Sequence, residues 1–223
     1  MLALKTLRFI VLFLIIIVPM QKVSANFTFF KVQFFNESIE YDTLRYSLKE
    51  ALKVDLKDVK FIYIEKRDSK KKKLTSGILK FENLEILYLR PEVKSRLNII
   101  NSSCYIKYYK SKLKMFPDEI TKLKNIRIID LIGNPQFKYE SELEKILELK
   151  SLEVLAIQPS KIDNNLIRVL GKFKQLKEIH IKYSANEEEK MYLNELKILL
   201  PKCKIGYSSM ADYCDSNYHV DFN

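Results

Sequence analysis

Apolar side chains recur in one pattern along the second half of this chain. The clearest copy begins at Leu123 and has apolar residues at its first, fourth, seventh and ninth positions; the next two copies begin at Leu149 and Phe173. The starts recur at a nearly constant interval of roughly 25 residues, which is typical of architectures in which each repeat supplies one strand and a helix or helical turn. We therefore expect each copy to form one strand of a common sheet.

The same pattern occurs upstream, with one irregular interval. Copies begin at Leu56 and Phe81, which are separated by a similar interval, but the next clear start, Leu123, comes too late for one ordinary repeat. Residues 97–109 either contain a degenerate strand, with the pattern beginning at Ile100, or form an inserted loop. We favour the degenerate repeat.

The seventh and ninth pattern positions should form one stacked core, because a strand turns alternate side chains to opposite faces. In the last three copies these core residues are Ile129, Leu131, Leu155, Ile157, Ile179 and Ile181. Ahead of the first copy, residues 41–53 read as a helix whose apolar stripe is Leu44, Leu48, Ala51 and Leu52. Residues 26–38 alternate aromatic and polar groups, which predicts a strand or an apolar cover for the first end of the array.

The repeated phrase resembles that of leucine-rich repeat proteins, in particular exported bacterial ones. Residues 46–52 look like the N-terminal cap of such proteins, residues 113–120 resemble their convex-side linker, and residues 200–205 resemble their truncated last strand. The family's strand phrase usually ends in Asn, whose amide bonds to neighbouring turns. Here only Asn134 matches that position.

The resemblance implies an α/β fold, a leucine-rich repeat solenoid (horseshoe) with a parallel concave sheet and with helices or helical turns on the convex side. It covers roughly residues 41–207. The expected organisation is a signal peptide at 1–25, an N-terminal cap at 26–55, an array of about five to six repeats at 56–207, and a polar C-terminal tail at 208–223.

The segment 1–25 has the order of features that export requires. Lys5 and Arg8 precede a short apolar run, Phe9–Met20, and small residues follow at 23–25. We expect cleavage after Ala25 and a secreted or cell-envelope location, either periplasmic or extracellular. The alternative is an uncleaved N-terminal anchor, and only in that case do we expect a membrane partner.

Charge and cysteine content add two further expectations. The formal net charge is +11, which suits acidic partners, although we favour a solvated lysine-rich surface and expect no nucleic acid. Cys203 and Cys214 could form a disulfide that pins the tail, or these residues and Cys104 could remain three separate thiols.

No motif indicates catalysis, so we expect a protein that is not an enzyme and has no cofactor or metal. Among the five clear repeats His180 is the one histidine, and the aligned Asp130 lies two strands away, roughly 10 Å at ordinary strand spacing. No Gly-rich phosphate loop, HExxH motif or EF-hand loop occurs.

The residues between the core positions should line the concave surface. They are unusually apolar and aromatic for a solvated face, which predicts binding of an unidentified protein ligand. The predicted binding residues are Phe61, Tyr63, Ile86, Tyr88, Arg90, Ile128, Asp130, Val154 and His180. Alternatively, residues 27–35 or 97–109 fold over these side chains and bury them. The alternative function is a basic protein that binds a polyanion or a membrane surface.

Overall fold

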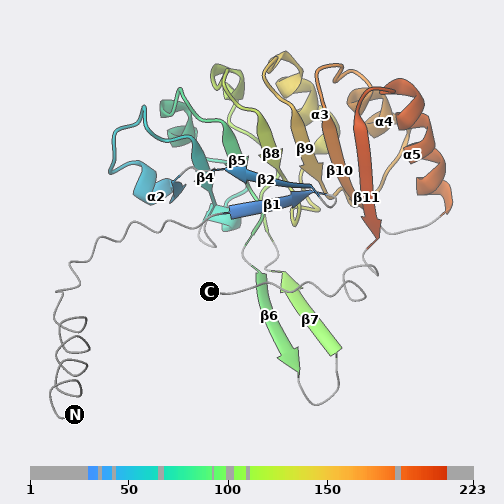
Figure 1. Ribbon diagram of the computed structural model, residues 1–223, viewed down its shortest axis with the longest axis horizontal. Helices are drawn as coiled ribbons and strands as arrows, with labels where there is room; N and C mark the ends of the chain where they lie inside the picture. The colour runs from blue at the N-terminus through green and yellow to red at the C-terminus, as the bar shows by residue number, and fades with distance from the viewer. Residues whose placement is uncertain are drawn as a thin grey trace, which may run out of the picture.

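A sheet of seven parallel strands forms the centre of the structure, a computed structural model that describes residues 30–34, 37–41, 44–64, 68–91, 93–98, 103–108, 111–183 and 187–209 (Figure 1). Its strands are β3 (Arg45–Ser47), β4 (Phe61–Tyr63), β5 (Ile86–Tyr88), β8 (Ile128–Asp130), β9 (Val154–Ile157), β10 (Glu178–Tyr183) and β11 (Lys204–Ser209). They lie side by side in chain order, from β3 at one edge to β11 at the other. Two antiparallel hairpins lie outside this sheet, β1 (Phe30–Phe34) with β2 (Glu37–Tyr41), and β6 (Val93–Asn98) with β7 (Ser103–Tyr108).

Each clear copy of the apolar pattern supplies one strand, as the sequence predicts. Residues at the seventh pattern position are paired across neighbouring strands, in the order Ile62, Leu87, Ile129, Leu155 and Ile179. The truncated copy at the end of the array also forms a strand, β11, which pairs with β10. Residues that hold the same position in successive copies of the pattern therefore lie opposite one another in neighbouring strands.

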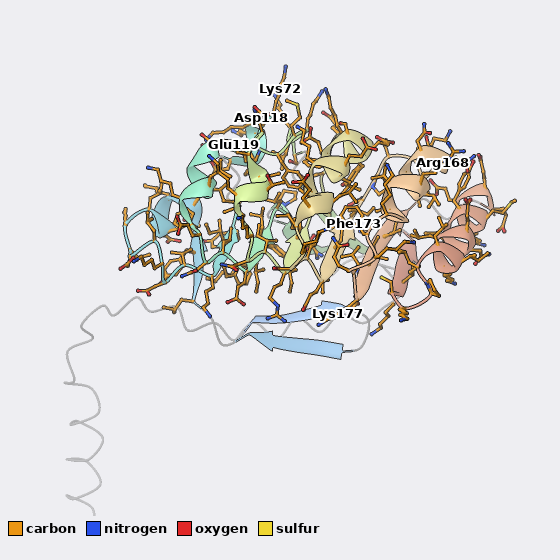
Figure 2. The ribbon with its side chains drawn as sticks, turned by 90° about the horizontal axis from the view of Figure 1, so that it is seen from above. Lys72, Asp118, Glu119, Arg168, Phe173 and Lys177 are labelled. Carbon is orange, nitrogen blue, oxygen red and sulfur yellow. The ribbon has the colours of Figure 1, made fainter. Side chains whose placement is uncertain are left out.

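Helices and 3-10 turns fill the connections between the strands. They are α2 (Leu48–Ala51), η1 (Asp68–Lys70), η2 (Ser76–Lys80), η3 (Ile120–Lys122), α3 (Tyr139–Lys145), η4 (Ile146–Glu148), α4 (Asn164–Leu170) and α5 (Glu187–Leu199). In the view from above, the helical elements from η2 to α4 lie along one side of the sheet, where Asp118 and Glu119 are labelled (Figure 2). No helix in the described part of the chain is long and apolar enough to cross a membrane.

The main hydrophobic core lies between the sheet and this helical layer. All six predicted core residues, from Ile129 to Ile181, are fully buried there, which confirms the register read from the sequence. Side chains from the helical layer, such as Leu143 of α3 and Leu166 of α4, complete the core from the other side. Burial of this apolar surface is the main contribution to the stability of the fold.

Polar side chains join each repeat to the one before it at the N-terminal edge of the strands. The residue at the third pattern position donates a hydrogen bond to a main-chain carbonyl of the preceding repeat. These bonds, of 2.7–2.9 Å, join Asn83 to Lys57, Asn125 to Glu82, and Ser151 to Lys124. They satisfy carbonyl groups that the short strands leave outside the sheet.

A row of alternating charges crosses the same edge, and we call it the charge row. It consists of the residues that immediately precede five successive strands, Lys60, Glu85, Arg127, Glu153 and Lys177. Each neighbour in the row is an ion-pair partner, with N–O distances of 3.0, 3.7, 2.9 and 2.8 Å in chain order. These side chains are partly solvated, so each pair contributes little stability alone.

The prediction of a degenerate repeat at residues 97–109 is wrong, and the alternative of an insertion is correct. β5 pairs directly with β8, and the residues between them form the separate β6–β7 hairpin. The proposed register would have put Ser103 at a position that the other repeats fill with a buried apolar side chain. A hydroxyl group in the core without a partner is costly.

The predicted helix at 41–53 is reduced to a single turn. β2 ends at Tyr41, and residues 45–47 pair with β4 instead of continuing a helix. Ser47 caps α2, because its hydroxyl accepts a hydrogen bond from the Glu50 main-chain N–H while the Glu50 carboxylate accepts one from the Ser47 N–H. Leu44 and Leu52, two members of the predicted apolar stripe, are exposed.

Several predictions concern residues at the two ends of the chain. The predicted signal peptide at 1–25 and Cys214 lie outside the described residues. Cys203 is a half-buried free thiol, and burial raises the pKa of this thiol to about 11. The alternating stretch at 26–38 does form strands where it is described, in β1 and the start of β2.

Candidate functional site

The sheet face turned away from α3 and α4, here called the front face, carries all of the predicted binding residues. Strand pairing aligns one column of Phe61, Ile86, Ile128, Val154 and Glu178. It aligns a second column of Tyr63, Tyr88, Asp130, Ala156 and His180. Arg90 lies two residues after the end of β5 and forms an ion pair with Asp130 of the next strand. The alternation of the strands thus places these residues together as the sequence predicts.

A second hydrophobic cluster, separate from the main core, covers the middle of the front face. Its buried members are Phe61, Ile86, Ile128, Ile132, Val154 and Ala156, with Tyr63 and Tyr88 packed against them. The rings of Phe61 and Tyr88 are tilted against each other at a centroid distance of 6.4 Å. The sheet therefore has an apolar layer on each of its two faces.

The prediction that this patch is exposed is wrong. Phe61 is 1% exposed, Ile128 2% and Val154 5%, and Asp130 is fully buried, whereas Tyr63, Tyr88, Arg90 and His180 are half-buried. Figures 1 and 2 both place the β1–β2 hairpin across the front face, on the side opposite the helical layer. This position agrees with the alternative that the Phe-rich stretch lies over these side chains. The β6–β7 hairpin extends away from the sheet (Figure 1).

Arg45 is a member of the front face that the sequence pattern did not indicate. Its guanidinium carbon lies 5.5 Å from the ring centroid of Phe61, 4.6 Å from that of Tyr63 and 5.5 Å from that of Tyr88. Burial lowers the pKa of Arg45, and the two tyrosines oppose that shift. A cation held over three aromatic faces gains cation–π attraction in a partly desolvated place.

Arg90 and Asp130 form an ion pair at the centre of the front face. The Arg90 guanidinium donates to Asp130 Oδ2 at 2.8 Å, and the Ile132 main-chain N–H donates to Oδ1 at 2.9 Å. Burial raises the pKa of Asp130, and Arg90 is the main influence that lowers it. The Arg90 guanidinium also lies over the Tyr88 ring, at 5.3 Å from its centroid.

The front face becomes polar toward the C-terminal end of the array. On β10, Glu178 and Lys182 are buried charged residues, and the half-buried His180 lies between them on the same face. Neither Glu178 nor Lys182 is among the predicted binding residues. Burial, together with the positive charges of Arg90 and Lys182, lowers the pKa of His180 to about 4.

This histidine should make folding stability depend on pH. A folded-state pKa below the ordinary value of about 6.5 means that the neutral ring stabilises the fold above pH 6.5 and that this stability is lost as the pH falls toward 4. The expected loss from this one group is roughly 2–3 kcal/mol in the free energy of unfolding. Urea unfolding of the wild type and His180→Gln between pH 7 and pH 4 measures it, and the variant should show a shallower decline. Equal pH slopes would contradict the prediction.

Asp130 and His180 do not occupy neighbouring strands of the sheet. Asp130 and His180 are separated by β9, and Asp130 is already bonded to Arg90 and to the main chain of Ile132. Within the described ranges, no three His, Cys, Asp or Glu side chains lie together as metal ligands would.

Among known proteins, no family model matches the chain and no curated protein shows a significant match.

Proposed function

We propose that this chain is an exported leucine-rich repeat protein that binds another protein through the front face. Three observations support the repeat assignment. The apolar phrase recurs five times, equal phrase positions are paired in the sheet, and each connection returns through a helical element. Export is proposed on the order of charge, apolar run and small residues at the N-terminus.

Asn134 supports the same assignment, because its amide serves the role that the family resemblance implies. Asn134 Nδ2 donates to the main-chain oxygens of Leu89, Leu131 and Ile132 at 2.9, 3.0 and 3.3 Å, which joins one turn to the next. The preceding Gly133 has φ +83°, and a Cβ there would lie 2.6 Å from Pro91 Cδ. Glycine is therefore required for this turn to pack against the neighbouring one.

The observation that carries the binding function is the second hydrophobic cluster. The main core lies on the other side of the sheet, so the front-face cluster is apolar and aromatic surface in addition to that core. Tyrosine and arginine beside aliphatic residues form the composition that protein interfaces favour. Tyr63, Tyr88, Arg45 and Arg90 supply it here.

The cover over this cluster is compatible with exchange for a partner. β1 and β2 are paired with each other, and no strand pairing joins them to the seven-stranded sheet among the described residues. Displacing the hairpin breaks no ladder of main-chain hydrogen bonds there. In the proposed mechanism the partner gains access to the cluster when the hairpin moves off the front face.

The test is partner capture by the Tyr63→Ala/Tyr88→Ala double variant. Partners are captured from the envelope and growth medium of the producing cell with the wild type, identified, and then titrated against both proteins. We expect the double variant to bind an identified partner at least tenfold more weakly, because each tyrosine is a candidate anchor. Its melting temperature should change little, because both rings are half-buried and lie outside the main core.

A matched control is Met191→Ala/Tyr192→Ala, which removes two large side chains from α5, away from the front face. This control should bind the partner like the wild type. Two outcomes would contradict the proposal: an equal loss in the control, or unfolding of the Tyr63/Tyr88 variant, which would make this cluster a structural layer.

A further inference from the structure

The β6–β7 hairpin is an insertion that the repeat architecture does not use. β5 and β8 are neighbours in the sheet, so the chain leaves the array after β5 and returns to it before β8. Between these points the two strands pair over six residue positions, from Val93 opposite Tyr108 to Asn98 opposite Ser103. In Figure 1 the ribbon extends away from the sheet and from every helix.

The pairing register divides the ribbon into an apolar and a basic set of positions. Residues at alternate positions of a strand share a face, and directly paired residues of two antiparallel strands share the same face. One face therefore collects the positions of Val93, Leu97, Cys104, Ile106 and Tyr108, with Ser95 as its polar member. The other face collects the positions of Lys94, Arg96 and Lys107, together with those of Asn98, Ser103 and Tyr105.

The charge around the hairpin has one sign. Residues 93–117 contain five lysines and one arginine, and they contain no aspartate or glutamate. Elsewhere in the array, lysines and arginines pair with acids, as in the charge row, although residues 70–73 form a second basic run of four lysines. The insertion is therefore one of two basic segments, and it is the one that extends away from the sheet.

A two-stranded ribbon with one apolar face is stabilised by contact with another surface. Two strands alone are marginally stable in water, and their apolar face gains stability only when it is covered. A ribbon that is apolar on one face and basic on the other suits the boundary between lipid chains and anionic headgroups, where both faces are satisfied at once. Strands of six residues are shorter than the roughly 9–11 residues that span a bilayer, so the ribbon would lie along the surface.

We propose that the β6–β7 hairpin docks this protein on an anionic lipid surface. The apolar positions enter the interfacial region, and Lys94, Arg96 and Lys107 bind the headgroups. A soluble polyanion would use the basic positions alone, and a second copy of this chain would bring the same positive charge against itself. The proposal is independent of partner binding at the front face.

The test compares sedimentation with phosphatidylcholine vesicles and with vesicles that also contain phosphatidylglycerol, at low salt. The full chain is used throughout, so that any binding by the apolar run at 9–20 is common to all variants and is measured on the neutral vesicles. We expect the wild type to prefer anionic vesicles. Lys94→Gln/Arg96→Gln/Lys107→Gln should lower that preference on the order of a hundredfold, at about 1 kcal/mol for each basic residue.

Two further variants make the result specific. Lys80→Gln/Lys150→Gln/Lys161→Gln removes the same charge from exposed lysines elsewhere and should retain most of the preference. Leu97→Ser/Ile106→Ser keeps the charge and should lose most of the binding. Equal loss in the charge control, binding unaffected by the Leu97/Ile106 change, or a Leu97/Ile106-dependent dimer without vesicle binding would each overturn the proposal.

Discussion

Replacing Leu155 by alanine should lower the free energy of unfolding by about 2–5 kcal/mol. Leu155 is fully buried in β9, and its register neighbours in the adjacent strands are Ile129 and Ile179. The main chain on both sides is fixed by strand pairing, so the space cannot collapse and a cavity remains between two turns. Chemical denaturation followed by circular dichroism measures the loss.

A suitable control is Ile198→Ala on α5, whose side chain is 79% exposed. It removes similar apolar volume from the surface and should change the free energy of unfolding by no more than about 0.5 kcal/mol. A Leu155 variant with the same stability as this control would show that the register of the core is incorrect.

Replacing Asp130 by alanine should cost about 3–5 kcal/mol, because it breaks a buried ion pair from one side. The change leaves the half-buried guanidinium of Arg90 without its carboxylate and the Ile132 N–H without its acceptor. Both groups that lose their partner lie in one small region of the front face, next to the hydrophobic cluster. Thermal and urea unfolding of the purified variant measure them together.

Asp130→Asn separates the effect of shape from the effect of charge. Asparagine keeps an acceptor for Ile132 and removes a charge that burial opposes, since the pKa of Asp130 is raised. This variant should therefore retain most of the wild-type stability at neutral pH. A loss as large as that of Asp130→Ala would mean that attraction to Arg90 outweighs the cost of burying the carboxylate.

The strands and the core could be predicted because their signal is local and repeated. Each phrase places apolar residues at the same positions, and stacking the phrases buries them. The core positions of Leu155 and its neighbours can therefore be predicted by counting along the phrase. The turn at 48–51 and the strand at 45–47 could not be separated in this way. The boundary between them depends on the pairing of residues 45–47 with β4. The apolar pattern within 41–53 contains no information about that pairing.

The sequence predicts which residues lie on the front face, but it does not predict that they are buried. Strand alternation puts Phe61, Tyr88 and Asp130 on that face, whatever lies over it. The β1–β2 hairpin, which lies across this face in Figures 1 and 2, is distant in sequence from these strands, and Arg45 comes before the first phrase, so it has no repeat position to identify it. Long-range contacts of this kind leave no local pattern.

The charge row has a consequence for how such an array can grow or shrink. Because its signs alternate from Lys60 to Lys177, deleting or duplicating a single repeat within it would bring two like charges together at the junction. Removing or adding two adjacent repeats preserves the alternation. The smallest exchangeable unit of this array is therefore a pair of repeats, so length variants built by gene duplication or by design should tolerate changes of two more readily than changes of one.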